Sequence, residues 1–143
     1  NKALSLANKS AMTLSDKFCV DRHKESFFNM VKEDLDITFA NEQEITSLIE
    51  AKKFEDIITF AKELKKLIVI TRSDKGSIAI SGAEVVECSS QKNLKILDLT
   101  GAGDLFAAGF LDGYINNKTI KESLEKGTEM ASKVIQIIGA RLS

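Results

Sequence analysis

Short apolar runs of strand length alternate with helical segments along this chain, and that alternation constrains the fold more than any other feature. Strands are expected at residues 11–14, 37–40, 67–71, 77–81, 83–88 and 94–99, and helices at 24–31, 42–50, 54–64, 105–111 and 119–138. Strands separated by helices form a mainly parallel sheet that is covered on both faces. The expected fold is therefore a three-layer α/β/α domain, with ligands beyond the carboxyl ends of the strands.

Composition narrows the class of protein. A chain of 143 residues, 43% of them hydrophobic, can bury one hydrophobic core, so a single domain is expected. The net charge of -1 comes from scattered acids and bases, which argues against a nucleic-acid or membrane surface as partner. The chain has no run of about 18 apolar residues and no signal peptide, so a cytoplasmic location is expected.

Cysteine and histidine offer little chemistry. Cys19 and Cys88 lack metal-ligand spacing and are expected to be reduced thiols. His23, the single histidine, provides neither a triad nor a zinc site.

The segment from Asp98 to Asp104 combines the features of an anion site with those of a base. Gly101, Ala102 and Gly103 lie between two carboxylates, directly before an apolar helix. At a helix N-terminus, free N–H groups and the helix dipole favour a phosphate or a developing oxyanion. Asp104, in the first helical turn, is placed to take a proton from an attacking hydroxyl. The alternative is a tight turn with Asp104 as a helix cap.

The run from Asp98 to Gly109 resembles the signature Asp-Thr-x-Gly-Ala-Gly-Asp of the ribokinase, or PfkB-type, carbohydrate and nucleoside kinases. Leu99 replaces the usual Thr. The resemblance implies that Asp104 is the general base. It implies that the backbone amides of Gly101, Ala102 and Gly103 hold the transferring phosphoryl group. It also implies that Thr100 and Gly103 contact the nucleotide.

Two further segments resemble motifs of the same kinases. Asn41 and Glu44 match an Asn-x-x-Glu motif that organises phosphates and the water shell of a magnesium ion. The residues alone favour a capping box, and both roles can hold together. Thr71, Ser73 and Gly76 match a Thr-x-Gly-x-x-Gly nucleotide loop, with Ser73 in place of the first glycine. An ordinary turn closed by Gly76 is the alternative.

The end of the chain, residues 131–136 followed by Gly139, Ala140 and Arg141, resembles the helix and loop that flank the adenine in these kinases. Spacing alone makes the helix simply core, ending on a glycine. Some members hold a monovalent cation there, and the backbone of Asp98 is the candidate ligand for K⁺.

The closest resemblance is to bacterial adenosine-kinase-like members, through residues 14–23, 39–44 and 104–111. Family members are about twice this length, so residues 1–143 are expected to be the C-terminal, nucleotide-binding half of one ribokinase-like domain. The N-terminal half, with the acceptor pocket and lid, is its expected partner.

The resemblance implies ATP- and Mg²⁺-dependent transfer of the γ-phosphoryl group to a hydroxymethyl group, most readily of adenosine or a related nucleoside. A sugar such as ribose or fructose is the second candidate acceptor, and a non-catalytic nucleotide-binding module is the alternative of another class. The isolated chain is expected to be inactive, because positioning supplies much of the catalysis in phosphoryl transfer.

Overall fold

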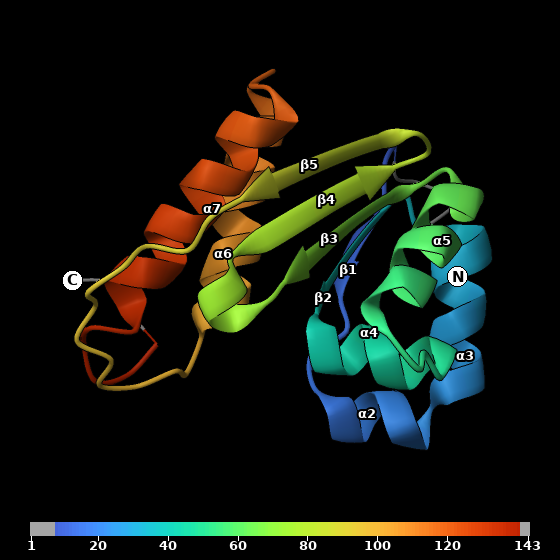
Figure 1. Ribbon diagram of the computed structural model, residues 1–143, viewed down its shortest axis with the longest axis horizontal. Helices are drawn as coiled ribbons and strands as arrows, with labels where there is room; N and C mark the ends of the chain where they lie inside the picture. The colour runs from blue at the N-terminus through green and yellow to red at the C-terminus, as the bar shows by residue number, and fades with distance from the viewer. Residues whose placement is uncertain (1–7, 141–143) are drawn as a thin grey trace. The chain divides into compact units, whose positions relative to one another are not determined.

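The elements alternate along the chain as the pattern indicates (Figure 1). The structure, a computed structural model, describes residues 8–140. Its elements are β1 (Ala11–Thr13), α2 (Lys17–Arg22), α3 (Lys24–Asn29), the π-helical turn η1 (Met30–Asp34), β2 (Ile37–Asn41), α4 (Glu42–Ile49), α5 (Phe54–Leu64), β3 (Leu67–Thr71), the 3-10 turn η2 (Ser73–Lys75), β4 (Ser77–Ser81), β5 (Glu84–Cys88), α6 (Ala102–Ile115) and α7 (Ile120–Val134). No helix within residues 8–140 is both long and apolar enough to cross a bilayer.

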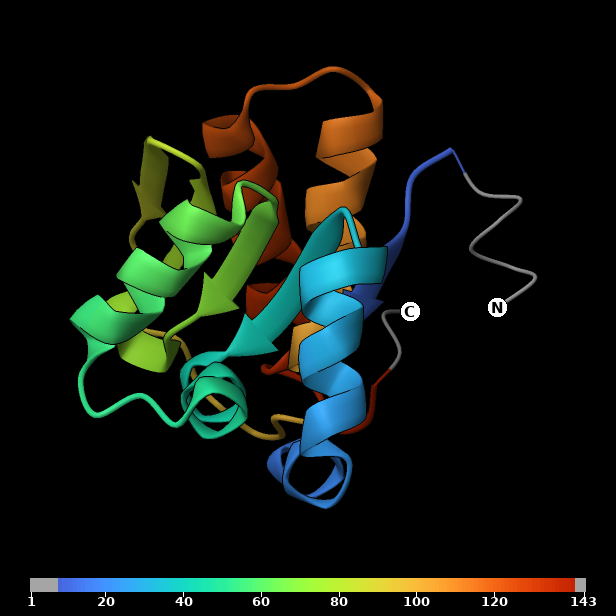
Figure 2. The same ribbon diagram turned by 90° about the vertical axis from the view of Figure 1, so that its right-hand side faces the viewer.

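The five strands pair in chain order, β1-β2-β3-β4-β5. β1 and β2 are parallel, with Ala11 opposite Ile37 and Thr13 opposite Phe39. Figure 2 shows β2 and β3 running the same way. Residues 72–76 and 82–83 are connections too short for a crossover, so β4 is antiparallel to both of its neighbours. The expected α/β class is confirmed, with a parallel part and a hairpin.

Two compact units divide the chain. The first takes in the chain up to Ile70 together with residues 80–85, and the second takes in residues 71–79 and the chain from Val86 onward. In the first unit, β2 and β3 are buried along almost their whole length, as their continuous apolar runs require. Their core neighbours from the helices include Val20, Val31, Ile45, Leu48, Ile57 and Ala61.

In the second unit, α6 and α7 approach closely at glycines. A Cβ atom at Gly109 would lie 2.8 Å from the Lys126 carbonyl oxygen, and one at Gly127 would lie 2.8 Å from the Phe106 carbonyl oxygen. The Phe106 ring also lies at this contact, 3.1 Å from an added Cβ atom at Gly127. α7 begins with a capping box between Thr119 and Glu122. The two helices therefore pack closely against each other at these glycines.

The structure corrects three expectations. Residues 94–99 form no strand, because the amides of Leu97 and Asp98 both donate to the Ile135 carbonyl, at 2.8 and 3.3 Å, and not to a sheet neighbour. α7 ends at Val134 and not at residue 138, and Ile138 is 87% exposed. Gly139 (φ 95°) therefore does not end the helix, and lies beyond several turn residues.

The structure contains one helix that was not predicted, and one residue named in the sequence analysis lies outside the described part of the chain. Helix α2 was not predicted from the sequence. Its N-cap is Asp16, whose side chain accepts a 2.8 Å hydrogen bond from the Cys19 amide. Arg141 lies outside the described residues.

Candidate functional site

The turn before α6 is held by both oxygens of one carboxylate. Asp98 accepts a hydrogen bond from the Thr100 amide at 2.8 Å through Oδ1 and from the Gly139 amide at 3.0 Å through Oδ2. Hydrogen bonds from Thr100, and then from Gly139, hold the pKa of Asp98 below its ordinary value. Asp98 therefore ties the loop that follows α7 to the loop that precedes α6.

Gly101 turns this loop into the helix. Its φ of 78° lies in the left-handed region, and an added Cβ atom would lie 2.8 Å from Cβ of Ala140. The Ala102 amide donates to the Leu99 carbonyl at 3.2 Å, and the first helical hydrogen bond joins the Leu105 amide to the Gly101 carbonyl at 2.9 Å. The amides of Gly103 and Asp104 thus precede the regular ladder, as donors at a helix start do. This end of α6 can accept an anion.

Asp104, unlike Asp98, makes no hydrogen bond of this kind with residues 8–140. It lies in the first turn of α6 and is exposed. The helix N-cap is Gly101, and α6 has no side-chain cap hydrogen bond. Within residues 8–140 no hydrogen bond or ion pair holds the Asp104 carboxylate. The alternative of a capping role for Asp104 therefore has no support in this geometry.

The connection between β3 and β4 is a tight, internally bonded loop. The Arg72 amide donates to the Gly76 carbonyl at 2.7 Å, and the Gly76 amide donates to the Ser73 carbonyl at 3.1 Å. Ser73 has a φ of 51°, so a serine adopts the left-handed backbone that a glycine would take without strain. Gly76 has a φ of 89°, and a Cβ atom there would lie 2.0 Å from the Cys88 carbonyl oxygen.

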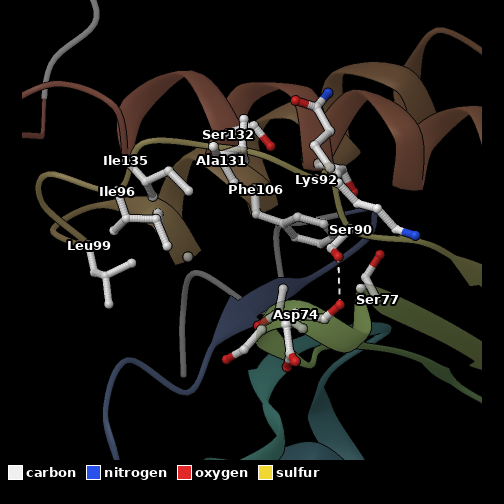
Figure 3. A pocket seen from close by; sticks show the side chains of 18 of the residues that line it. Asp74, Ser77, Ser90, Lys92, Ile96, Leu99, Phe106, Ala131, Ser132 and Ile135 are labelled. Atoms are coloured by element: carbon white, nitrogen blue, oxygen red, sulfur yellow. Dashed lines mark hydrogen bonds between the residues drawn. The ribbon is translucent and has the colours of Figure 1, made fainter.

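A cavity of about 860 Å³ lies within the second unit (Figure 3). It brings together the β3–β4 loop, the segment 90–99, the start of α6 and one side of α7. Of the residues expected from the sequence to contact a nucleotide or its phosphates, Thr71, Ser73, Gly76, Ala102 and Gly103 line it, together with Ala131, Ser132 and Ile135 from the segment expected beside the adenine. Thr100, Gly101 and Asp104 are not among its lining residues. Figure 3 shows Phe106, Ala131 and Ile135 along one wall and Asp74 across from them, where its carbonyl accepts a 2.6 Å hydrogen bond from Ser90 Oγ. The volume lies in the range of small-molecule sites.

Several lining residues were not expected from the sequence. They are Asp74, Ser77, Gln91, Lys92, Asn93, Phe106 and Thr128, among others. The polar run 89–93 between a strand and an apolar segment was a usable signal. The burial of Ser77 was not, because it depends on the packing of the neighbouring segments.

Asn41 and Glu44 belong to the first unit and form the reciprocal capping box. The Asn41 amide donates to Glu44 Oε2 at 2.9 Å, Asn41 Nδ2 donates to Oε1 at 2.9 Å, and the Glu44 amide donates to Asn41 Oδ1 at 2.8 Å. Glu44 is only 5% exposed. Burial, with a smaller contribution from the negative charge of Asp16, raises the pKa of Glu44. Within residues 8–140 no three His, Cys, Asp or Glu side chains are grouped to hold a metal.

Comparison with known proteins places these features in a family. The model of a family described as pfkB family carbohydrate kinase matches residues 1–143. A cytidine kinase of Thermococcus kodakarensis is 36% identical over 107 residues, which cover 71% of this chain and 37% of that protein. The chain thus spans well under half the length of this curated relative.

Two solved structures extend the comparison. An adenosine kinase of Sinorhizobium meliloti superposes with a TM-score of 0.92 and 38% identity, over 99% of this chain and 45% of that one. The ribokinase of Arabidopsis thaliana, solved with ribose and ATP, gives a TM-score of 0.69 and 27% identity, over 79% of this chain and 38% of that one. These likenesses show a ribokinase-like fold.

Proposed function

The chain belongs to the pfkB family of carbohydrate kinases, and we propose that it is the C-terminal, nucleotide-binding half of an ATP-dependent kinase that phosphorylates a ribose-like acceptor. The observation that carries the proposal is the cavity of the second unit. Thr71, Ser73, Gly76, Ala102 and Gly103 all line it, although they come from the end of β3 with its following loop and from the start of α6, which are far apart in the sequence. In the proposal, the kinase acts in the cytoplasm and needs neither nucleic acid nor a membrane.

Two groups of residues that line or adjoin the cavity suit the two parts of ATP. Phe106, Ala131 and Ile135 offer an apolar wall against which a base ring can pack. Gly103 and Asp104 supply backbone N–H groups at the start of α6, where phosphate charge is favoured. Lys92, which also lines the cavity, adds a positive charge.

Asp104 is the general base in the proposed mechanism. Its exposed carboxylate, one residue beyond Gly103, takes the proton of the acceptor hydroxyl as that oxygen attacks the γ-phosphorus in line. The bond from this phosphorus to the bridging oxygen breaks on the opposite side, and ADP leaves with that oxygen. The amides of Gly101, Ala102 and Gly103 neutralise charge on the transferring group, with Thr100 beside them. The Ala102 amide must first leave the Leu99 carbonyl, to which it donates at 3.2 Å.

Glu44 is the proposed magnesium residue, acting through water. Mg²⁺ is often bound by one or two carboxylates together with substrate phosphates and water, so a cluster of three protein ligands is not required. The raised pKa of Glu44, with Asp16 as a second carboxylate nearby, marks a place where a cation would favour the ionised form. When bound, Mg²⁺ neutralises phosphate charge. Asn41 fixes the Glu44 side chain, and the Asp98 backbone remains the candidate for K⁺.

A nucleoside is the preferred acceptor. Relatives named adenosine kinase and cytidine kinase share 38% and 36% identity with the chain, but a probable sugar kinase shares 37%, so identity alone does not separate the two classes. The preference rests on the adenosine-kinase-like segments 14–23, 39–44 and 104–111. A sugar of the ribose or fructose type is the second candidate acceptor. A non-catalytic nucleotide-binding module remains the alternative of another class.

Phosphorylation assays with the complete kinase test the function. With ATP and Mg²⁺, we expect turnover of adenosine or another nucleoside well above that of ribose and fructose, measured as ADP released. The 143-residue chain alone should be inactive, because it lacks the acceptor half in this proposal. Robust turnover by the isolated chain would contradict the half-enzyme proposal, and a complete protein that binds ATP without phosphorylating any acceptor would favour the module.

A further inference from the structure

Ser77, the first residue of β4, carries a buried hydroxyl without a hydrogen-bond partner. The residue is 4% exposed, and its Oγ is the one buried side-chain polar atom in residues 8–140 that lacks a partner. A buried hydroxyl normally forms a hydrogen bond, because leaving it unpaired costs free energy. Ser77 also lines the cavity, and Figure 3 shows its side chain directed into it.

Two other hydroxyls that line the cavity, those of Ser90 and Thr128, already form hydrogen bonds with the protein. Ser90 Oγ donates to the Asp74 carbonyl at 2.6 Å, and Thr128 Oγ1 donates to the Leu124 carbonyl at 2.9 Å. Neither proton is free for a ligand while these bonds last. The Ser77 hydroxyl, in contrast, forms no hydrogen bond with the described residues. This is the arrangement expected of a side chain that binds a ligand in the cavity.

We infer that Ser77 is a nucleotide-specificity residue whose hydroxyl forms a hydrogen bond with the neutral polar edge of the nucleobase. This inference rests on the proposed ATP site and adds a residue that the motifs did not indicate. Phe106, which lines the same cavity and is only 4% exposed, gives it an apolar surface against which a base ring can pack, while Lys92 gives it a positive charge. Because Ser77 is itself buried, a charged phosphate at its hydroxyl would lose much of its hydration, whereas a neutral base edge needs only one hydrogen bond there. The phosphates go to the start of α6, at Gly103.

The test compares Ser77→Ala with the unchanged protein in the complete kinase, by calorimetry with ATP and with inorganic tripolyphosphate. The variant should bind ATP about tenfold more weakly, the cost of one hydrogen bond. Its binding of tripolyphosphate, which has no base, should be unchanged. Its melting temperature without ligand should be equal or higher, because an unpaired buried hydroxyl has been removed. Ser81→Ala, at the other end of β4, is the control and should leave every value unchanged.

Each other outcome is distinct. If Ser77→Ala binds ATP as tightly as the unchanged protein, the inference is wrong while the ATP site stands. A lower melting temperature with unchanged ATP affinity would show that Ser77 has a structural partner, such as a buried water. Equal weakening of ATP and tripolyphosphate would assign the hydroxyl to phosphate and overturn the base contact. Failure of the unchanged protein to bind ATP would instead contradict the proposed function.

Discussion

Replacing Asp104 by Asn in the complete kinase is expected to lower kcat about 10²- to 10⁴-fold and to leave the affinity for ATP nearly unchanged. Asparagine keeps the size of the side chain and the helix start but cannot accept the proton of the acceptor. The carboxylate is exposed and makes no hydrogen bond or ion pair within residues 8–140, so its removal breaks no described structural contact. Steady-state kinetics, with calorimetry for ATP, separates the two effects.

Glu44→Gln is the comparison for Asp104→Asn. Its loss of activity should act through the metal, so that part of the activity returns as Mg²⁺ is raised, whereas Asp104→Asn should show no such recovery. A loss of about 1 kcal/mol in the free energy of unfolding, with turnover intact in Asp104→Asn, would identify Asp104 as a helix cap. That outcome would show the base assignment to be wrong.

Gly76→Ala should have the largest structural effect. The backbone of Gly76, at φ 89° and ψ -137°, is open almost only to glycine, and the new Cβ atom would lie 2.0 Å from the Cys88 carbonyl oxygen. Strain and the forced displacement of the end of β5 should together lower the free energy of unfolding by on the order of 3 kcal/mol. Because Gly76 lines the cavity, ATP binding should be lost as well. Chemical denaturation and calorimetry measure the two losses.

Gly82→Ala is the matched control for Gly76→Ala. Gly82 also has a positive φ, of 58°, but a Cβ atom there would have no other atom within 4 Å. Its cost should be limited to the left-handed backbone, about 1–2 kcal/mol, with ATP binding retained. Equal losses in the free energy of unfolding in the two variants would show that the contact with Cys88 contributes nothing to the destabilisation.

Much of the fold follows from local pattern. β3 and α5 begin and end where the apolar runs and the helical spacing predict. Both elements are continuous in their pattern, so local preference and burial agree. The segment 94–99 shows the opposite case. Its apolar residues have strand character, but hydrogen bonds to the end of α7 take the amides that a ladder would use, and Leu99 stays 67% exposed.

The candidate site was partly predictable for the same reason. Gly76 and Gly101 are required by backbone geometry that a turn imposes locally, so the sequence marks both. Ser73 also adopts a left-handed backbone conformation, but the sequence has no glycine at this position to indicate it. Ser77 could not be predicted, because its hydroxyl is orphaned only once β4 and its neighbours have packed.

Hydrogen–deuterium exchange of the complete kinase, with and without ATP and Mg²⁺, tests the shared nucleotide site most directly. We expect slower exchange on ATP binding in three segments together, residues 71–77, 100–106 and 128–135, because they line or adjoin one cavity. Gly82 and its turn should be unaffected. ATP binding that protects none of the three segments, or the α6 start without the β3–β4 loop, would contradict the account.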